Sequence, residues 1–171
     1  SLVTDPLNLW DEEIGIYVLG PNAALESPFD GANYYNKWER EASIALYENG
    51  DTVFNENCGL EIFGQTSRMK DKKSFEIKFR KKYGTSYIRC NLFDSRVSIN
   101  RFDRLVLRSG AQDFDRSVFR DELLTELIDG SLDVLVQANK ACVLYLNGEY
   151  FFEKPPFREP PGVSPEGFYQ E

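Results

Sequence analysis

The sequence predicts an α+β fold, in which a mostly antiparallel β-sheet packs against at least one helix. Strand candidates outnumber helix candidates, and turn signals at residues 49–51 and at Asn147-Gly148 favour hairpins. The 171 residues are 42% hydrophobic and 14% aromatic, which suffices for one core. We therefore expect one domain at residues 1–150. An irregular tail at 151–171, which holds five of the eight prolines, should follow it.

The first half of the chain is predicted to contain three strands after an irregular lead-in. Residues 1–37 are rich in Pro, Asn, Gly and Asp, apart from a short apolar run at 14–19, and indicate an extended lead-in with turns. Apolar and polar or small residues then alternate at 42–47, 58–64 and 73–79. Such alternation is typical of strands with one buried face.

The second half is predicted to hold a further strand at 102–108, a loop at 109–113 and then a helix. Asp115 or Ser117 would cap this helix, and Asp129-Gly130 would end it. Its apolar positions are Phe119, Leu123, Leu124, Leu127 and Ile128. Two last strands are expected at 134–138 and 142–146.

Composition narrows the possible functions. The 28 acidic and 20 basic residues give a net charge of −8, which should repel nucleic acid, and no apolar stretch is long enough to span a membrane. There is no histidine, so Ser-His-Asp and Cys-His catalysis are excluded. Cys58, Cys90 and Cys142 lie far apart and are expected to be buried free thiols, with no metal site. Since the sequence begins without Met, we expect it to be cut from a longer chain.

A basic run stands out in this acidic chain. It indicates either a local anion-binding site or a solvated strand edge protected by lysines. Its members are Arg68, Lys70, Lys72, Lys73, Lys78, Arg80, Lys81 and Lys82.

Two neighbouring segments could complete such an anion site. The loop with Gly64, Ser67 and Arg68 could cover a phosphate, although a glycine between strands is commonly only a turn. On the predicted helix, Glu122 and Glu126 share a face, and either could pair with Lys73 or lie at the surface. Asp113 and Asp115 could cap the helix or hold a divalent cation.

Read together, these segments resemble the CotH (spore coat protein H) kinase family. The matching words are Thr4-Asp5-Pro6, Asn8-Leu9-Trp10, Gly15 to Val18, Trp38-Glu39-Arg40, Gly59 to Gly64, Ser67-Arg68, Lys72 to Phe75, Tyr83-Gly84, Leu107-Arg108, Asp113, Phe119 to Leu123, and Tyr145 to Tyr150.

The resemblance implies an atypical kinase-like domain that binds Mg-ATP and phosphorylates serine or threonine of bacterial spore-coat or surface proteins, with this chain as its smaller, nucleotide-covering lobe. Lys73 would contact phosphate, Glu122 or Glu126 would be its helical partner, and Gly64, Ser67 and Arg68 would lie near the phosphates. The expected catalytic and metal-binding acids are not in this chain, so it should be inactive alone. The alternative is a non-catalytic structural or binding module at a bacterial cell or spore surface.

The chain also departs from the family pattern. Gly64-Gln65 replaces a pair of glycines, which leaves the loop less free to approach a phosphate. After Tyr150, Pro155 and Pro156 interrupt the expected strand, because proline cannot donate a hydrogen bond to its neighbour.

Overall fold

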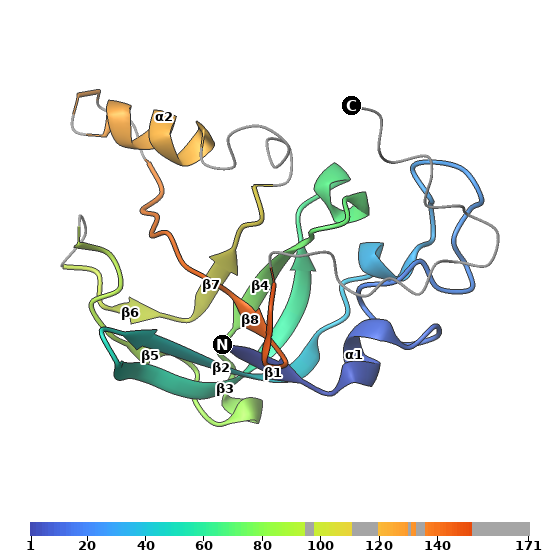
Figure 1. The fold of residues 1–171 in the computed structure, drawn as a ribbon, viewed down its shortest axis with the longest axis horizontal. Helices are drawn as coiled ribbons and strands as arrows, with labels where there is room; N and C mark the ends of the chain where they lie inside the picture. The colour runs from blue at the N-terminus through green and yellow to red at the C-terminus, as the bar shows by residue number, and fades with distance from the viewer. Residues whose placement is uncertain (95–97, 111–119, 130, 133–135, 152–171) are drawn as a thin grey trace.

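A computed structural model of the protein describes residues 1–94, 98–110, 120–129, 131–132 and 136–151. It confirms the α+β class, since a mostly antiparallel sheet dominates and helices are few (Figure 1). The elements, in chain order, are β1 (Leu2–Thr4), α1 (Pro6–Trp10), the 3-10 helix η1 (Asn33–Tyr35), β2 (Arg40–Glu48), β3 (Asp51–Phe63), the 3-10 helix η2 (Thr66–Met69), β4 (Ser74–Lys78), the 3-10 helix η3 (Lys81–Tyr83), β5 (Ile88–Arg89), β6 (Arg101–Phe102), β7 (Arg104–Leu107), α2 (Arg120–Ile128), β8 (Tyr145–Leu146) and β9 (Glu149–Tyr150).

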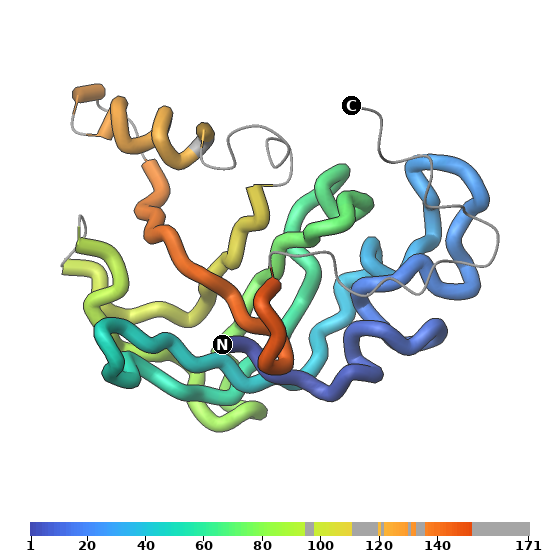
Figure 2. The backbone as a smooth tube through the Cα atoms, viewed as in Figure 1, coloured from blue at the N-terminus to red at the C-terminus, as the bar shows by residue number. Residues whose placement is uncertain are grey.

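The main sheet has the strand order β7-β4-β3-β2-β1-β8-β9. Its pairs are antiparallel except for β1 and β8, which run parallel with Leu2 opposite Leu146. The long β2–β3 hairpin turns at Asn49-Gly50, and β8–β9 turns at Asn147-Gly148, as predicted. All four turn residues have positive φ, which Asn and Gly tolerate best. The blue amino-terminal segment therefore lies beside the orange-red segment that contains β8 (Figure 2).

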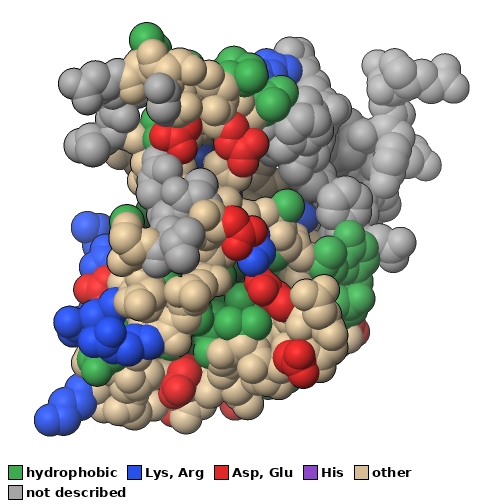
Figure 3. Space-filling view, turned by 90° about the vertical axis from the view of Figure 1, so that its left-hand side faces the viewer, with side chains coloured by type: hydrophobic (Ala, Val, Ile, Leu, Met, Phe, Trp, Pro, Cys, Tyr) green, Lys and Arg blue, Asp and Glu red, His purple; other side chains and the backbone are tan. Residues whose placement is uncertain are grey.

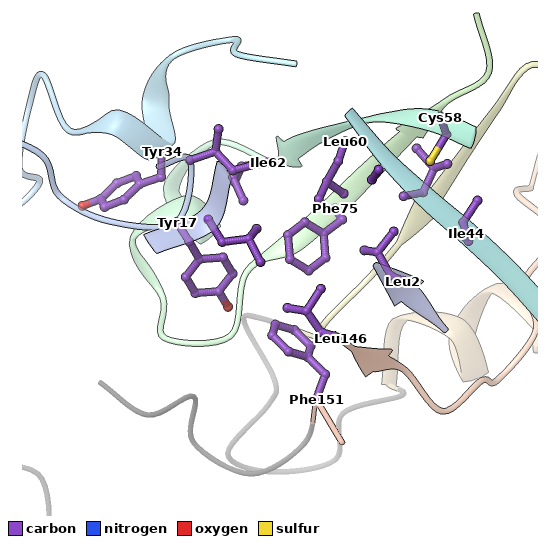
Figure 4. Close-up of a cluster of buried hydrophobic side chains, with 14 of the residues drawn as sticks. Leu2, Tyr17, Tyr34, Ile44, Cys58, Leu60, Ile62, Phe75, Leu146 and Phe151 are labelled. Atoms are coloured by element: carbon purple, nitrogen blue, oxygen red, sulfur yellow. The ribbon is translucent and has the colours of Figure 1, made fainter. Parts of the chain in front are cut away.

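The core lies on one face of the sheet. Leu60 and Ile62 of β3 and Phe75 and Ile77 of β4 are fully buried there, as the alternation predicted. Because the sheet curls, the β8–β9 hairpin returns over β4, and Phe151 packs on Phe75 with ring centroids 5.5 Å apart (Figure 4).

The opposite face of the same strands carries charge rather than apolar side chains. Glu61 and Glu76 lie opposite each other on β3 and β4, and both are almost fully buried. Lys78 Nζ donates to Glu61 and lies 3.2 Å from Glu76 Oε2, while Arg104 Nη1 lies 2.8 Å from Glu76 Oε1. The basic run is therefore not gathered in one place, since Lys78 serves this network.

Several sequence predictions differ from the structure. The lead-in at residues 1–37, expected to be extended with turns, instead contains β1, α1 and η1, and the backbone N–H groups of Ile16 and Tyr17 donate to the carbonyls of Asn8 and Leu9 of α1. The predicted strand at 102–108 is divided into β6 and β7 at Asp103, whose carbonyl accepts from Phe79. Residues 142–144 lie outside β8.

Other predictions lie partly or wholly outside the described residues. These are the cap at Asp115 or Ser117, Asp113, Phe119, Gly130, and the first part of the strand expected at 134–138, of which residues 136–138 are irregular. The tail from 152 onward also lies outside them, and the division at 150/151 stays a prediction.

The cysteine prediction is only half right. All three thiols are free, but Cys58 alone is buried, whereas Cys90 is half-buried and Cys142 is exposed. Cys142 is exposed because it precedes the short strand β8 rather than lying within a longer one.

Candidate functional site

A small pocket lies where the β8–β9 hairpin returns over the ends of β4 and β7. Its volume is about 80 Å³, and the polar residues that line it are Lys72, Lys73, Arg108, Ser109 and Tyr150. Apolar side chains, including Phe75, Leu107, Leu144 and Phe151, form the rest of the wall. Three cationic side chains thus lie around one concave, partly apolar space, which we call the cationic pocket.

Two serines fix the strands that form this pocket. Ser74 Oγ lies 3.1 Å from Ser109 Oγ, and the Ser109 backbone N–H donates to Ser74 Oγ at 3.0 Å. Both residues are buried, so these hydrogen bonds form in a dry environment where they hold geometry well. The start of β4, which directly follows Lys73, is thereby held against the end of β7, which directly precedes Arg108.

Lys73 is the most constrained of the three cations. Its side chain is 5% exposed, and its Nζ donates to the Lys70 carbonyl at 2.8 Å. The ammonium also lies 4.4 Å from the ring centroid of Tyr34 and 5.0 Å from that of Tyr17. Burial lowers the pKa of Lys73 to about 8, because desolvation disfavours the charged amine.

Tyr17 connects Lys73 to the core. The Lys73 backbone N–H donates to the Tyr17 hydroxyl at 2.8 Å, and this hydroxyl donates to the Asp71 carbonyl at 2.8 Å. Burial raises the pKa of Tyr17, so the phenol stays protonated. Burial likewise raises the pKa of Tyr34 to about 12. The two rings therefore stay neutral and form a cage around the ammonium, at one end of the core cluster in Figure 4.

The loop with Gly64, Ser67 and Arg68 lies apart from the lining of the pocket. The Arg68 guanidinium donates to the carbonyls of Gly64, Tyr34 and Tyr35, so it ties the loop to η1. Gly64 has φ +109°, and a Cβ there would meet Ser67 Oγ at 2.1 Å. In this structure these three residues hold the loop and the Tyr34 backbone rather than line the pocket.

The structure does not bring Lys73 and either helical glutamate together. Glu122 of α2 lies 3.6 Å from Arg108 through Oε1, and its buried Oε2 has no hydrogen-bond partner among the residues that the structure describes. Glu126 is exposed on the same helix. The acid of α2 therefore faces the pocket through Arg108, while the Lys73 ammonium is held by Lys70 and the two tyrosines.

Sequence reasoning missed the residues that complete the site. Tyr17 and Tyr34 lie in the lead-in, where little chemistry was expected, and no local pattern links them to Lys73. Arg108 and Ser109 offered a weak signal, since they follow a predicted strand. Among the described residues, no three His, Cys, Asp or Glu side chains are grouped as metal ligands.

None of the helices in the described part of the chain has the length and apolar composition that a bilayer-spanning helix needs. No curated protein and no solved structure shows significant similarity to the chain. The family model for CotH kinase protein matches residues 60–152, which is more than half of the chain and includes Lys73, Arg108, Glu122 and the β8–β9 hairpin. The chain therefore belongs to the CotH kinase family.

Proposed function

We propose that this chain forms the nucleotide-covering lobe of a CotH-type kinase, which transfers phosphate from Mg-ATP to serine or threonine of spore-coat or surface proteins. The observation that carries the proposal is the convergence of Lys72, Lys73 and Arg108 on one pocket in a chain of net charge −8. Three cations and a hydroxyl suit a phosphate group, because charge-assisted hydrogen bonds to phosphate oxygens are strong. Family membership makes nucleotide phosphate the natural ligand.

The size of the pocket limits what it holds. Its volume of about 80 Å³ is far below the roughly 300–1,000 Å³ of pockets that enclose small molecules. The pocket would therefore bind only the terminal phosphate of the nucleotide, and the nucleoside would lie outside the pocket. Lys73 and Arg108 would offset the charge of the phosphate, and Ser109 would help to orient it.

Transfer itself needs more than this pocket. Phosphoryl transfer depends on metal-holding acids and on a residue that orients the acceptor hydroxyl. We assign neither metal binding nor orientation of the acceptor hydroxyl to residues of this chain. We therefore expect the chain by itself to bind Mg-ATP and to phosphorylate a serine-rich peptide weakly or not at all.

Nucleotide binding can be tested by calorimetric titration of the protein with Mg-ATP, Mg-ADP and AMP. Binding should weaken as phosphates are removed, and Lys73→Met or Arg108→Gln should each weaken Mg-ATP binding about tenfold or more. Lys37→Met is the control, because Lys37 is exposed and does not line the pocket. Equal affinity of the wild type and Lys73→Met would reject Lys73 as a phosphate contact.

One observation favours a second candidate function. The Lys73 ammonium is already held by Lys70 and two tyrosine rings, as in a lysine whose role is structural. The alternative is then a non-catalytic structural or binding module at a spore or cell surface. Absence of any Mg-ATP binding, in a protein that melts cooperatively, would favour this alternative over the kinase lobe.

A further inference from the structure

Two arginines on the small β5–β6 sheet differ from the other arginines that the structure describes. Bonds to a carboxylate or a backbone carbonyl are made by Arg40, Arg68, Arg80, Arg104 and Arg108. For Arg89 and Arg101, by contrast, the Tyr87 ring is the only recorded partner within the described residues. These two guanidinium groups are therefore available to an outside anion.

The fold holds this arginine pair, Arg89 and Arg101, at one spot. Arg89 of β5 lies directly opposite Arg101 of β6, and the neighbouring pair is Ile88 opposite Phe102. Ile88 is buried and Phe102 packs against Phe93 at 5.6 Å, so the alternation turns both arginines outward. Tyr87 lies on the same face as Arg89, two residues before it along the strand.

The Tyr87 ring orders both guanidinium groups. It lies 4.2 Å from Arg101 Cζ and 5.4 Å from Arg89 Cζ. The Tyr87 backbone is itself fixed, because its carbonyl accepts from Thr85 Oγ1 at 2.7 Å. An aromatic contact of this kind restricts a long side chain before a ligand arrives, which reduces the entropy lost on binding.

Like charges directly opposite on two strands destabilise a sheet. The placement of Arg89 and Arg101 is therefore unfavourable for this two-stranded sheet unless an anion bridges them. A carboxylate carries one negative charge, whereas a phosphate monoester carries about 1.5–2 near pH 7 and offers three acceptor oxygens. The pair of positive charges matches the phosphate monoester better.

The overall charge selects among ligands that carry phosphate. The net charge of −8 should repel a long phosphate backbone or an anionic membrane. A single phosphate on a flexible segment can approach Arg89 and Arg101 without bringing further negative charge close to the acidic surface. Figure 3 looks onto the side of the molecule that carries β5 and β6, and Lys and Arg side chains gather in its lower part. This favours a short phosphorylated segment of a protein.

We propose that Arg89, Arg101 and Tyr87 form a binding site for phosphoserine or phosphothreonine in a protein segment. The site would retain a partner that has already been phosphorylated and so favour further phosphorylation of the same chain. The choice of a phosphorylated protein, rather than another phosphate monoester, rests on the proposed kinase function. The inference that the arginine pair binds a doubly charged anion is independent of that function.

The test is fluorescence anisotropy of the full chain with a short serine-rich peptide that carries one phosphoserine. This peptide should bind about tenfold or more tightly than its unphosphorylated form and than a form with Glu at that position. Binding should weaken as the pH falls below about 6, where the phosphate takes up a proton. Inorganic phosphate should compete, but only weakly, if neighbouring peptide groups also contribute.

Three variants locate the site. Arg89→Gln with Arg101→Gln should lower the affinity about tenfold or more, and Arg101→Lys should lower it as well, because lysine lacks the planar fork of donors. The matched control is Lys37→Gln with Lys81→Gln, which removes the same charge from two exposed positions and should leave the affinity unchanged. The melting temperature of the double arginine variant should be unchanged or higher, since a like-charge pair is removed.

Several results would overturn the inference. Equal binding of the phosphorylated and unphosphorylated peptides excludes phosphate recognition, and equal binding of the Glu peptide indicates an acidic-peptide surface instead. An unchanged affinity in the double arginine variant places the site elsewhere. Mg-ATP binding, measured on the same variants, separates the two proposals. It should persist in the double arginine variant. A protein that binds the phosphopeptide but does not bind Mg-ATP would disprove the nucleotide function and leave the phosphopeptide site standing.

Discussion

Lys73 is a charged residue in a nearly dry environment, and its energetics distinguish a functional from a structural role. Its pKa in the folded protein is about 8, compared with 10.5 when exposed to water. Below pH 8 the Lys73 amine is protonated in both the folded and the unfolded chain, so the free energy of folding includes the full cost of burying the charged group. Between the folded pKa of about 8 and the unfolded pKa of 10.5, Lys73 holds more protons in the unfolded chain than in the folded one, so the free energy of unfolding should rise with pH.

We therefore predict that Lys73→Met raises the free energy of unfolding at pH 7 by about 1–3 kcal/mol. The advantage over the wild type should shrink as the pH rises from 8 to 10.5, because the wild-type amine is then neutral when folded. Urea unfolding of both proteins across this range measures the difference, and Lys37→Met is the control. Parallel curves for the wild type and Lys73→Met would contradict the prediction.

The sequence predicts Lys73 at the start of a strand, but not its surroundings. The alternation around β4 is a local property and is visible in the sequence. Tyr17 and Tyr34 lie 56 and 39 positions away from Lys73 and reach it only through the packing of an irregular lead-in. The pairing of a helical glutamate with Arg108 instead of Lys73 depends equally on tertiary structure.

Among the elements, the two Asn-Gly hairpins look alike in sequence but differ in their contacts. Both asparagines have positive φ, Asn49 at 53° and Asn147 at 52°. Asn49 is exposed, whereas the Asn147 side chain accepts from the Thr4 backbone N–H at 2.9 Å, and its own N–H donates to Leu2. Asn147 therefore joins the β8–β9 hairpin to β1 as well as forming a turn.

This difference predicts unequal costs for the same substitution. Asn49→Ala and Asn147→Ala both place Ala at positive φ, but only the second leaves the buried Thr4 N–H without its partner. Asn147→Ala should therefore lower the free energy of unfolding by about 1–3 kcal/mol more than Asn49→Ala. Urea denaturation of the two variants is the measurement, and equal losses would show that the Thr4 contact contributes nothing.

Turn chemistry made both hairpins predictable, because the signal lies within two adjacent residues. The length of the strands was less predictable. Residues 142–146 have the composition of a strand, yet only Tyr145 and Leu146 pair, since β8 has a short partner in β1 on one side. In the apolar run at 14–19, Ile16 and Tyr17 are buried without belonging to a strand, because their backbone N–H groups donate to α1.

At the scale of the whole molecule, the stability should reside in the sheet rather than in α2. Leu60 of β3 is completely buried, whereas Leu127 of α2 is 65% exposed. Leu60→Ala should therefore lower the free energy of unfolding by about 2–5 kcal/mol. Leu127→Ala, the same chemical change, should shift it by less than about 0.5 kcal/mol.

Equilibrium unfolding in urea checks this pair of variants. A cost above about 1 kcal/mol for Leu127→Ala would show that the exposed apolar side of α2 is covered in solution. Hydrogen exchange gives an independent readout, since amides of β2–β4 should exchange only on global unfolding and those of α2 more readily.

The interior position of β1 in the sheet has a consequence for how the chain is made. β1 lies between β2 and β8, so β1 is synthesised well before residues 145–146, which form one of its two neighbours. At synthesis rates of about 5–20 residues per second, that interval lasts several seconds or more. During it, β1 is a bare edge that can pair with another nascent chain. Until β8 has been synthesised, this edge of β1 therefore lacks the partner that covers it in the folded protein.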